Sequence, residues 1–177
     1  MMKSSRVTAP AAGLALAGAV ATGLAFAASA GAQTPVLGTD AASCVPGAPG
    51  HAALVRVSGF KDRQGRLRLQ YYSDNPDTFL ASGAYIRRQE VPMTASGDMV
   101  ICITVPGPGA YAFVVLHDRD EDGRLSIWSD GVGFSNNPRL ALAKPKVAPM
   151  LVAIGTGVTP IPVVMNYRRG FSVRPLG

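Results

Sequence analysis

The chain has 177 residues, with 17 Lys and Arg against 11 Asp and Glu, which gives a formal net charge of +6. Hydrophobic residues make up 47% of it, enough for a folded core, and this composition excludes a highly charged disordered chain. The basic excess is mild and shows no clusters of basic and aromatic residues, so we expect no nucleic acid partner.

Residues 1–32 have the pattern of a cleaved secretory signal peptide. Lys3 and Arg6 precede an apolar run over 9–28, and small residues at 28–32 fit a cleavage site. The alanine-rich run and its polar sequel favour cleavage over a membrane anchor, so we expect no stable membrane insertion afterwards. The sequence therefore predicts a periplasmic or secreted protein of about 145 residues, with 15 basic residues against 11 acidic ones.

Cys44 and Cys102 are the only cysteines of the chain. A lipoprotein anchor at Cys44 is excluded, because the polar stretch 33–40 separates it from the apolar run. In an oxidising compartment we expect the two cysteines to pair. The alternative, a buried free Cys102 with an exposed Cys44, is unusual in exported proteins. Closing a loop of about 60 residues would contribute ~4 kcal/mol in the chain-entropy model.

The chain after the signal peptide divides into three parts. Residues 33–50 contain three prolines and no hydrophobic periodicity, which predicts a flexible arm, and residues 169–177 form a C-terminal tail with few core-forming residues. Residues 51–168 predict an all-β domain with sandwich-like strand spacing. The expected strands are 54–58, 66–71, 84–91, 99–105, 111–116, 125–128, 150–154 and 161–167.

Strand 66–71 alternates strictly, with Leu67, Leu69 and Tyr71 facing the core and the arginines facing water. A Pro/Gly loop delivers Tyr111 to the next apolar strand, where we expect a structural hydrogen bond back to the loop. Asp74 and Asp77 belong to ordinary turn chemistry rather than to catalysis.

An acidic turn follows that apolar strand. Asp118, Asp120 and Asp122 alternate and Gly123 follows, as at positions one, three, five and six of an EF-hand calcium loop. The flanking residues predict strands rather than helices, so a true EF-hand is excluded. The bland alternative is a hairpin turn with three solvated carboxylates. These carboxylates repel one another, and a divalent cation would relieve that repulsion. We therefore give the ion site and the solvated turn equal weight.

The remaining ligands of such a site depart from the EF-hand pattern. Arg124 would offer its backbone carbonyl at position seven, but Ser129 occupies position twelve, and Asp130 comes one residue late. The candidate metal ligands are therefore Asp118, Asp120, Asp122, Arg124 and Asp130, and the candidate cofactor is calcium. Zinc is disfavoured, because calcium-type oxygen ligands dominate the turn.

A candidate ligand-binding loop lies beside the acidic turn. It consists of His117, Gly133, Phe134, Ser135 and Asn136. Ser135 or Asn136 would complete the coordination of an ion, or alternatively would satisfy buried backbone groups of the loop.

Several of these motifs resemble those of a bacterial exported family known as domain of unknown function 2141. The resemblance spans about 51–167 and rests on Gly109–Ala112, His117–Asp118, Asp122–Gly123 and the Gly-Phe-Ser-Asn-Asn stretch that begins at Gly133. It implies a single immunoglobulin-like or transthyretin-like β-sandwich of about seven to eight strands with no established activity. The segment before that last stretch is shorter here than in the family pattern.

The sequence predicts a non-enzymatic exported module of the cell envelope, with a calcium-stabilised acidic turn, that acts in binding or structure. Its partner would be an unknown envelope protein or surface ligand. The alternative is a metal-assisted hydrolase of an envelope polymer or small ester with His117 as general base, although no activating nucleophile motif accompanies it. A third hypothesis is a scaffold that presents the arm 33–50 to another envelope protein.

Overall fold

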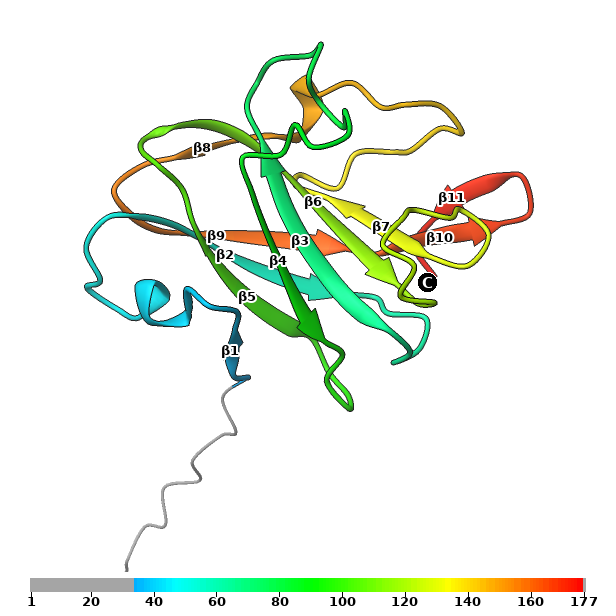
Figure 1. The fold of residues 1–177 in the computed structure, drawn as a ribbon, viewed down its shortest axis with the longest axis horizontal. Coiled ribbons are helices and arrows are strands. Elements are labelled where there is room, and N and C mark those ends of the chain that lie inside the picture. Colours follow the sequence, from blue (N-terminus) through cyan, green and yellow to red (C-terminus); the bar gives the residue numbers. More distant parts are fainter. Residues whose placement is uncertain (1–33, 177) are drawn as a thin grey trace, which may run out of the picture. The chain divides into compact units, whose positions relative to one another are not determined.

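The computed structural model describes residues 34–176 (Figure 1). Its strands are β1 (Val36–Leu37), β2 (His51–Ser58), β3 (Arg66–Tyr72), β4 (Arg87–Pro92), β5 (Met99–Thr104), β6 (Gly109–Asp118), β7 (Gly131–Phe134), β8 (Leu151–Ile154), β9 (Gly157–Val164), β10 (Asn166–Arg169) and β11 (Ser172–Arg174). Two short 3-10 helices accompany them, η1 (Ala41–Cys44) and η2 (Ala148–Met150). The expectation of an all-β sandwich is confirmed, with additional short strands at both ends of the described chain.

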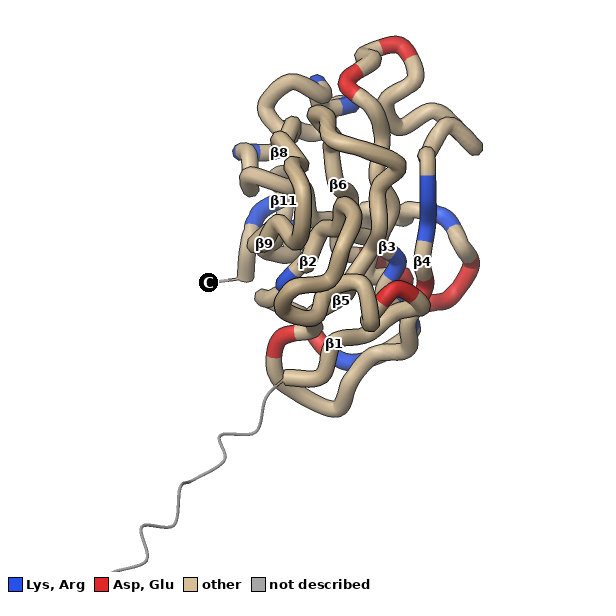
Figure 2. The backbone as a smooth tube through the Cα atoms, turned by 90° about the vertical axis from the view of Figure 1, so that its left-hand side faces the viewer, with Lys and Arg blue, Asp and Glu red and all other residues tan. Residues whose placement is uncertain are grey.

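The strands form two sheets. The smaller sheet has the order β1-β5-β2-β9, and the larger has the order β11-β10-β7-β6-β3-β4, with β8 paired to the first half of β6. Strand β6 therefore pairs with β3 along one edge and with β8 and then β7 along the other. Figures 1 and 2 show the arrangement of these strands from two directions at right angles.

The main core lies between the layers and follows the predicted alternation of β3. Leu67, Leu69 and Tyr71 are all buried on its inner side. The Tyr71 hydroxyl donates to the Thr104 carbonyl across the core. Tyr111 donates to the Gly107 carbonyl at 3.0 Å, which confirms the predicted structural role of this tyrosine.

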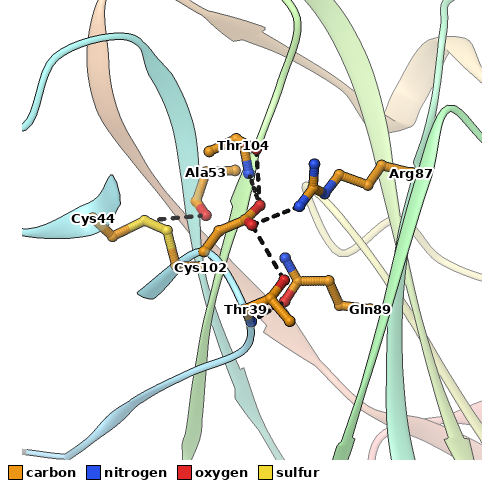
Figure 3. Close-up of a disulfide and its surroundings, with 8 residues drawn as sticks. Thr39, Cys44, Ala53, Arg87, Gln89, Cys102 and Thr104 are labelled. Atoms are coloured by element: carbon orange, nitrogen blue, oxygen red, sulfur yellow. Dashed lines mark hydrogen bonds and ion pairs between the residues drawn. A yellow bond between two sulfur atoms is a disulfide. The ribbon is translucent and has the colours of Figure 1, made fainter. Parts of the chain in front are cut away.

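The described part of the expected flexible arm differs from the prediction. Strand β1 pairs in parallel with β5, and η1 delivers Cys44 to Cys102, with which it forms the expected disulfide. Figure 3 shows Thr104 and Arg87 converging beside this disulfide. Both donate to the carboxylate of Asp40, which fixes the segment by polar contacts that hydrophobic periodicity does not reveal.

One strand prediction was wrong and another was wrong in part. Residues 125–128 form no strand: the Asp130 N–H donates to the Ser126 carbonyl and closes a turn, and Trp128 is 74% exposed beneath the Arg168 guanidinium. The expected last strand is divided into β9, which pairs with β2, and β10, which pairs with β7. The C-terminal tail contains β11, which pairs with β10.

A second hydrophobic cluster lies on the outer face of the larger sheet. Tyr72, Val114 and Phe134 point outward from β3, β6 and β7, and loop residues including Phe79 and Met150 cover them. The outer face of this sheet is therefore partly covered by loops rather than fully exposed to water.

The signal-peptide prediction concerns residues that lie outside the described part of the chain. Within residues 34–176, no helix has the length and apolar character needed to cross a membrane.

Candidate metal centre

The acidic turn connects the end of β6 to the start of β7. Asp118 is the last residue of β6, Asp120 and Asp122 lie in the turn, and Asp130 directly precedes β7. One carboxylate oxygen from each of these four residues lies within 4.8 Å of the others. The structure thus brings together all four aspartates that the sequence singled out.

Local hydrogen bonds give the turn its shape. Asp118 Oδ2 accepts from the Gly123 N–H at 3.1 Å, and Asp122 Oδ1 accepts from the Arg124 N–H at 2.7 Å. Asp120 Oδ1 accepts a longer bond from the Asp122 N–H. These bonds bend the backbone around the carboxylates, and Gly123 supplies the positive φ of +77° that the bend requires.

Asp130 closes the turn from its other end. Its Oδ1 accepts from the Arg119 N–H at 3.1 Å, and its Oδ2 accepts from the Ser126 N–H at 2.8 Å. The Asp130 carboxylate is buried and therefore cannot relax into solvent. It reaches the cluster although it stands one residue later than the last ligand of an EF-hand loop.

Asp118 is the most unusual member of the cluster. It is fully buried, and its Oδ1 is a buried acceptor without a hydrogen-bond partner among the described residues. Burial raises its pKa above the usual value, against the opposing effects of the Gly123 N–H and of two nearby arginines. A buried carboxylate oxygen left without a partner is costly, and a bound cation is one of the partners that would remove this cost.

Two arginines of β3 donate hydrogen bonds to backbone carbonyls of the turn. Arg66 Nη2 donates to the Glu121 carbonyl at 2.6 Å, and Arg68 Nη1 donates to the Gly123 carbonyl at 2.8 Å. The same guanidinium groups lie 3.4 and 3.6 Å from Asp118 Oδ2. They partly compensate the cluster's charge on one side of Asp118, while Oδ1 remains unpaired.

Arg119 fixes the turn from within. Its guanidinium forms an ion pair with Asp62 and donates to the Ser129 carbonyl at 2.6 Å. The hydrogen bond from Arg119 holds the pKa of Asp62 below its usual value, against burial, which raises it. With three arginines attached to its backbone, the turn is held in place before any ion binds.

Sequence reasoning missed these arginines as parts of the site. Arg68 was expected to face water, but it is only 6% exposed. The position of a residue on an alternating strand predicts which face of the sheet its side chain lies on, but it does not predict whether a loop covers that face. The available signal was strand register, because Arg66 pairs directly with Asp118.

His117 does not join the carboxylate cluster. It is fully buried, with Nδ1 2.7 Å from the Tyr167 hydroxyl and Nε2 2.8 Å from the Gln64 carbonyl. Burial lowers its pKa, which favours the neutral ring. Because both ring nitrogens have partners inside the fold, the contacts of His117 do not support its assignment as a general base.

The rest of the expected ligand-binding loop also serves the fold. Ser135 Oγ accepts from the Phe113 N–H and contacts the Met150 carbonyl, at the point where β6 exchanges β7 for β8. Asn136 donates to the carbonyls of residues 149 and 151. Of the two hypotheses for these residues, the structure therefore favours backbone satisfaction over ion coordination.

Gly133 and Phe134 have different positions. A Cβ atom on Gly133 would overlap Val163 of β9, so this glycine allows the two sheets to approach closely. Phe134 lies on the outer face of β7, in the second hydrophobic cluster. Neither residue contributes to the acidic cluster.

The chain matches the model of a known protein family. Residues 55–162 match the model of a family described as an uncharacterized protein conserved in bacteria, DUF2141. No curated protein and no solved structure matches the chain. The matched range includes three of the strands around the acidic turn, β3, β6 and β7, and the whole turn itself.

Proposed function

The chain belongs to the bacterial DUF2141 family, and from this premise we propose that it is an exported, non-enzymatic β-sandwich module of the cell envelope whose acidic turn binds calcium. The observation that carries the cation site is the unpartnered, fully buried Asp118 Oδ1 beside three further carboxylates. The disulfide between Cys44 and Cys102 supports export, because such bonds persist in oxidising compartments.

Calcium fits this cluster better than other biological cations. The side chains offer only oxygen ligands, which calcium and magnesium prefer over the softer metals. A turn with several carboxylates and backbone carbonyls suits the large, flexible coordination shell of calcium, whereas magnesium demands a small octahedron and retains water. Arg124 would contribute its backbone carbonyl, as position seven of the loop does in EF-hands.

The bound ion would act on the turn as a structural clamp. Four carboxylates within a few ångströms repel one another, and a divalent cation replaces that repulsion with attraction. The ends of β6 and β7 would thereby be fixed against each other. Loops at the end of a sandwich commonly carry binding surfaces, so a stiffened turn suits a role in binding or envelope structure.

Thermal unfolding of the oxidised protein in EDTA, in calcium and in magnesium tests this function. Calcium at a hundred times its dissociation constant would add about 2.7 kcal/mol to the free energy of unfolding. For a domain of about 145 residues this corresponds to a rise of the melting temperature on the order of 8 °C. Magnesium should give a smaller rise. Equal melting temperatures in all three buffers would contradict the proposal.

A matched pair of variants assigns the effect to the turn. Asp120→Ala should abolish the calcium-dependent rise, because it removes the ligand oxygen of an exposed member of the cluster without disturbing the core. Asp77→Ala removes an exposed carboxylate far from the cluster in sequence and should retain the full rise.

A further inference from the structure

A hollow lies on the outer face of the larger sheet, next to the second hydrophobic cluster. It has a volume of about 530 Å³ and is open to solvent. Strands β3, β4, β6 and β7 form its floor, the loops 80–83 and 140–145 form one wall, and residues 123–127 of the acidic turn contribute to another. The volume falls within the range of small-molecule sites in proteins.

The floor and walls of this hollow are largely apolar. Leu116 and Val132 continue the outward-facing hydrophobic column of β6 and β7 beyond the part that loops cover. Leu125, Ile127 and Leu142 are 50%, 40% and 55% exposed and line the same hollow. Single exposed apolar side chains are ordinary, but three around one hollow indicate a surface that accepts hydrocarbon.

The charged groups of the hollow are all basic. Arg68, Arg88 and Lys144 line it, and no Asp or Glu does. Arg68 is already paired, with its Nε 2.7 Å from Glu90 and its Nη2 3.6 Å from Asp118. The charge available to a ligand therefore comes from the other two residues.

Arg88 and Lys144 form no ion pair with any residue among 34–176. Arg88 donates from Nε to Gln70 at 2.9 Å and lies over the Tyr85 ring, which holds the guanidinium at the rim of the hollow. Lys144 is exposed on the loop that forms one wall. An anionic group at this rim would find two cations that no carboxylate holds in an ion pair.

We propose that this hollow binds a small anionic amphiphile, a molecule with an unbranched hydrocarbon body and one carboxylate. The hydrocarbon would lie on Leu116 and Val132, between Leu142 and the apolar side chains of the acidic turn. The carboxylate would contact Arg88 and Lys144. The site shares residues 123–127 of the acidic turn as one wall, but none of the four carboxylates of the acidic cluster lines it, and it needs no bound calcium.

Isothermal titration calorimetry of the oxidised protein with decanoate, decanol and decyltrimethylammonium tests the proposal. EDTA is present throughout, because calcium precipitates fatty carboxylates. Decanoate should bind with one-to-one stoichiometry and roughly tenfold more tightly than decanol, since a charge-assisted hydrogen bond adds about that factor. The cationic chain should bind most weakly. No saturable binding of decanoate, or equal affinity for all three chains, would overturn the proposal.

Variants separate the head-group contacts from the apolar floor. Arg88→Gln combined with Lys144→Gln should make decanoate and decanol bind equally, with the affinity for decanol unchanged. Arg56→Gln is the matched control, because Arg56 lies on the smaller sheet and does not line the hollow. Leu142→Glu, in an exposed loop where folding is not at risk, should weaken decanoate at least tenfold. Retention of the decanoate preference in the double variant would refute the assignment of the head group.

Discussion

The guanidinium of Arg68 donates a hydrogen bond from Nη1 to the backbone carbonyl of Gly123 over 2.8 Å, and so ties β3 to the acidic turn. The same side chain pairs with Glu90 at 2.7 Å and lies 3.6 Å from Asp118. One buried arginine therefore connects the sheet to the candidate cation site. Its removal should be felt in both the stability of the fold and the order of the turn.

Arg68→Met should lower the free energy of unfolding by about 2–4 kcal/mol, because it leaves the buried Asp118 carboxylate with less compensation. Urea denaturation in EDTA measures the loss. Arg56→Met is the control: Arg56 and Asp98 form an ion pair with side chains 56% and 41% exposed, and this variant should change stability by less than about 0.5 kcal/mol. Similar losses of unfolding free energy in the two variants would show that the contacts of Arg68 with the acidic turn do not stabilise the fold.

The Asp40 carboxylate should contribute to the loss of stability in acid. Burial raises its pKa, but the N–H and hydroxyl of Thr104 and the guanidinium of Arg87 outweigh burial and hold the pKa below the usual 3.8. Because the folded pKa lies below the unfolded value, this contribution is present above pH 3.8 and is lost as the pH falls through the folded pKa.

Asp40→Asn should therefore lower stability at neutral pH and flatten its decline in acid. Denaturation by urea at a series of pH values from neutral to about pH 3 measures that slope. Asp77→Asn, which changes an exposed carboxylate in another turn, should show the same slope of stability against pH as the unaltered protein. An unchanged slope in Asp40→Asn would count against the account of this carboxylate.

The disulfide should account for a large share of the stability of the domain. Cys44 and Cys102 are separated by 58 positions, and closing such a loop restricts the unfolded chain by about 4 kcal/mol in the chain-entropy model. The double variant Cys44→Ala and Cys102→Ala should show this loss in urea denaturation. A reductant should lower the stability of the original protein and leave that of the double variant unchanged. A reductant effect in both would point to a cause other than this bond.

Gly133 should tolerate no side chain. A Cβ atom there would overlap Val163 of the opposing sheet, so Gly133→Ala should destabilise the domain by about 1–3 kcal/mol through overpacking. Gly155 is a suitable control, because a Cβ atom on it would contact nothing within 4 Å. Equal melting temperatures for Gly133→Ala and Gly155→Ala would show that the sheets can separate at little cost.

Local patterns in the sequence predicted several features correctly. The alternation of 66–71 identified the buried face of β3, and the spacing of the acidic residues identified a turn where Asp130 joins the other carboxylates. The presence of two cysteines in the chain predicted the disulfide correctly. These features depend on neighbouring residues or on a rare residue type, which a sequence displays directly.

Features set by distant contacts were not predicted. The proline content of the arm before residue 50 predicts flexibility, but the polar contacts of Asp40 with Thr104 and Arg87 fix the arm and leave no pattern in the sequence. Residues 125–128 read as a strand, but the Asp130 carboxylate binds the Ser126 N–H and holds a turn. In both cases an aspartate carboxylate accepts hydrogen bonds that hold the segment, so local propensity does not decide the structure.

Calorimetric titration of calcium into the metal-free oxidised protein tests the central claim most directly. The account predicts one saturable site per chain in the unaltered protein and roughly tenfold or more weaker binding in Asp118→Asn, because this change removes the negative charge of the buried carboxylate whose Oδ1 has no other partner. Absence of saturable heat in the unaltered protein, or unchanged binding in Asp118→Asn, would contradict the account.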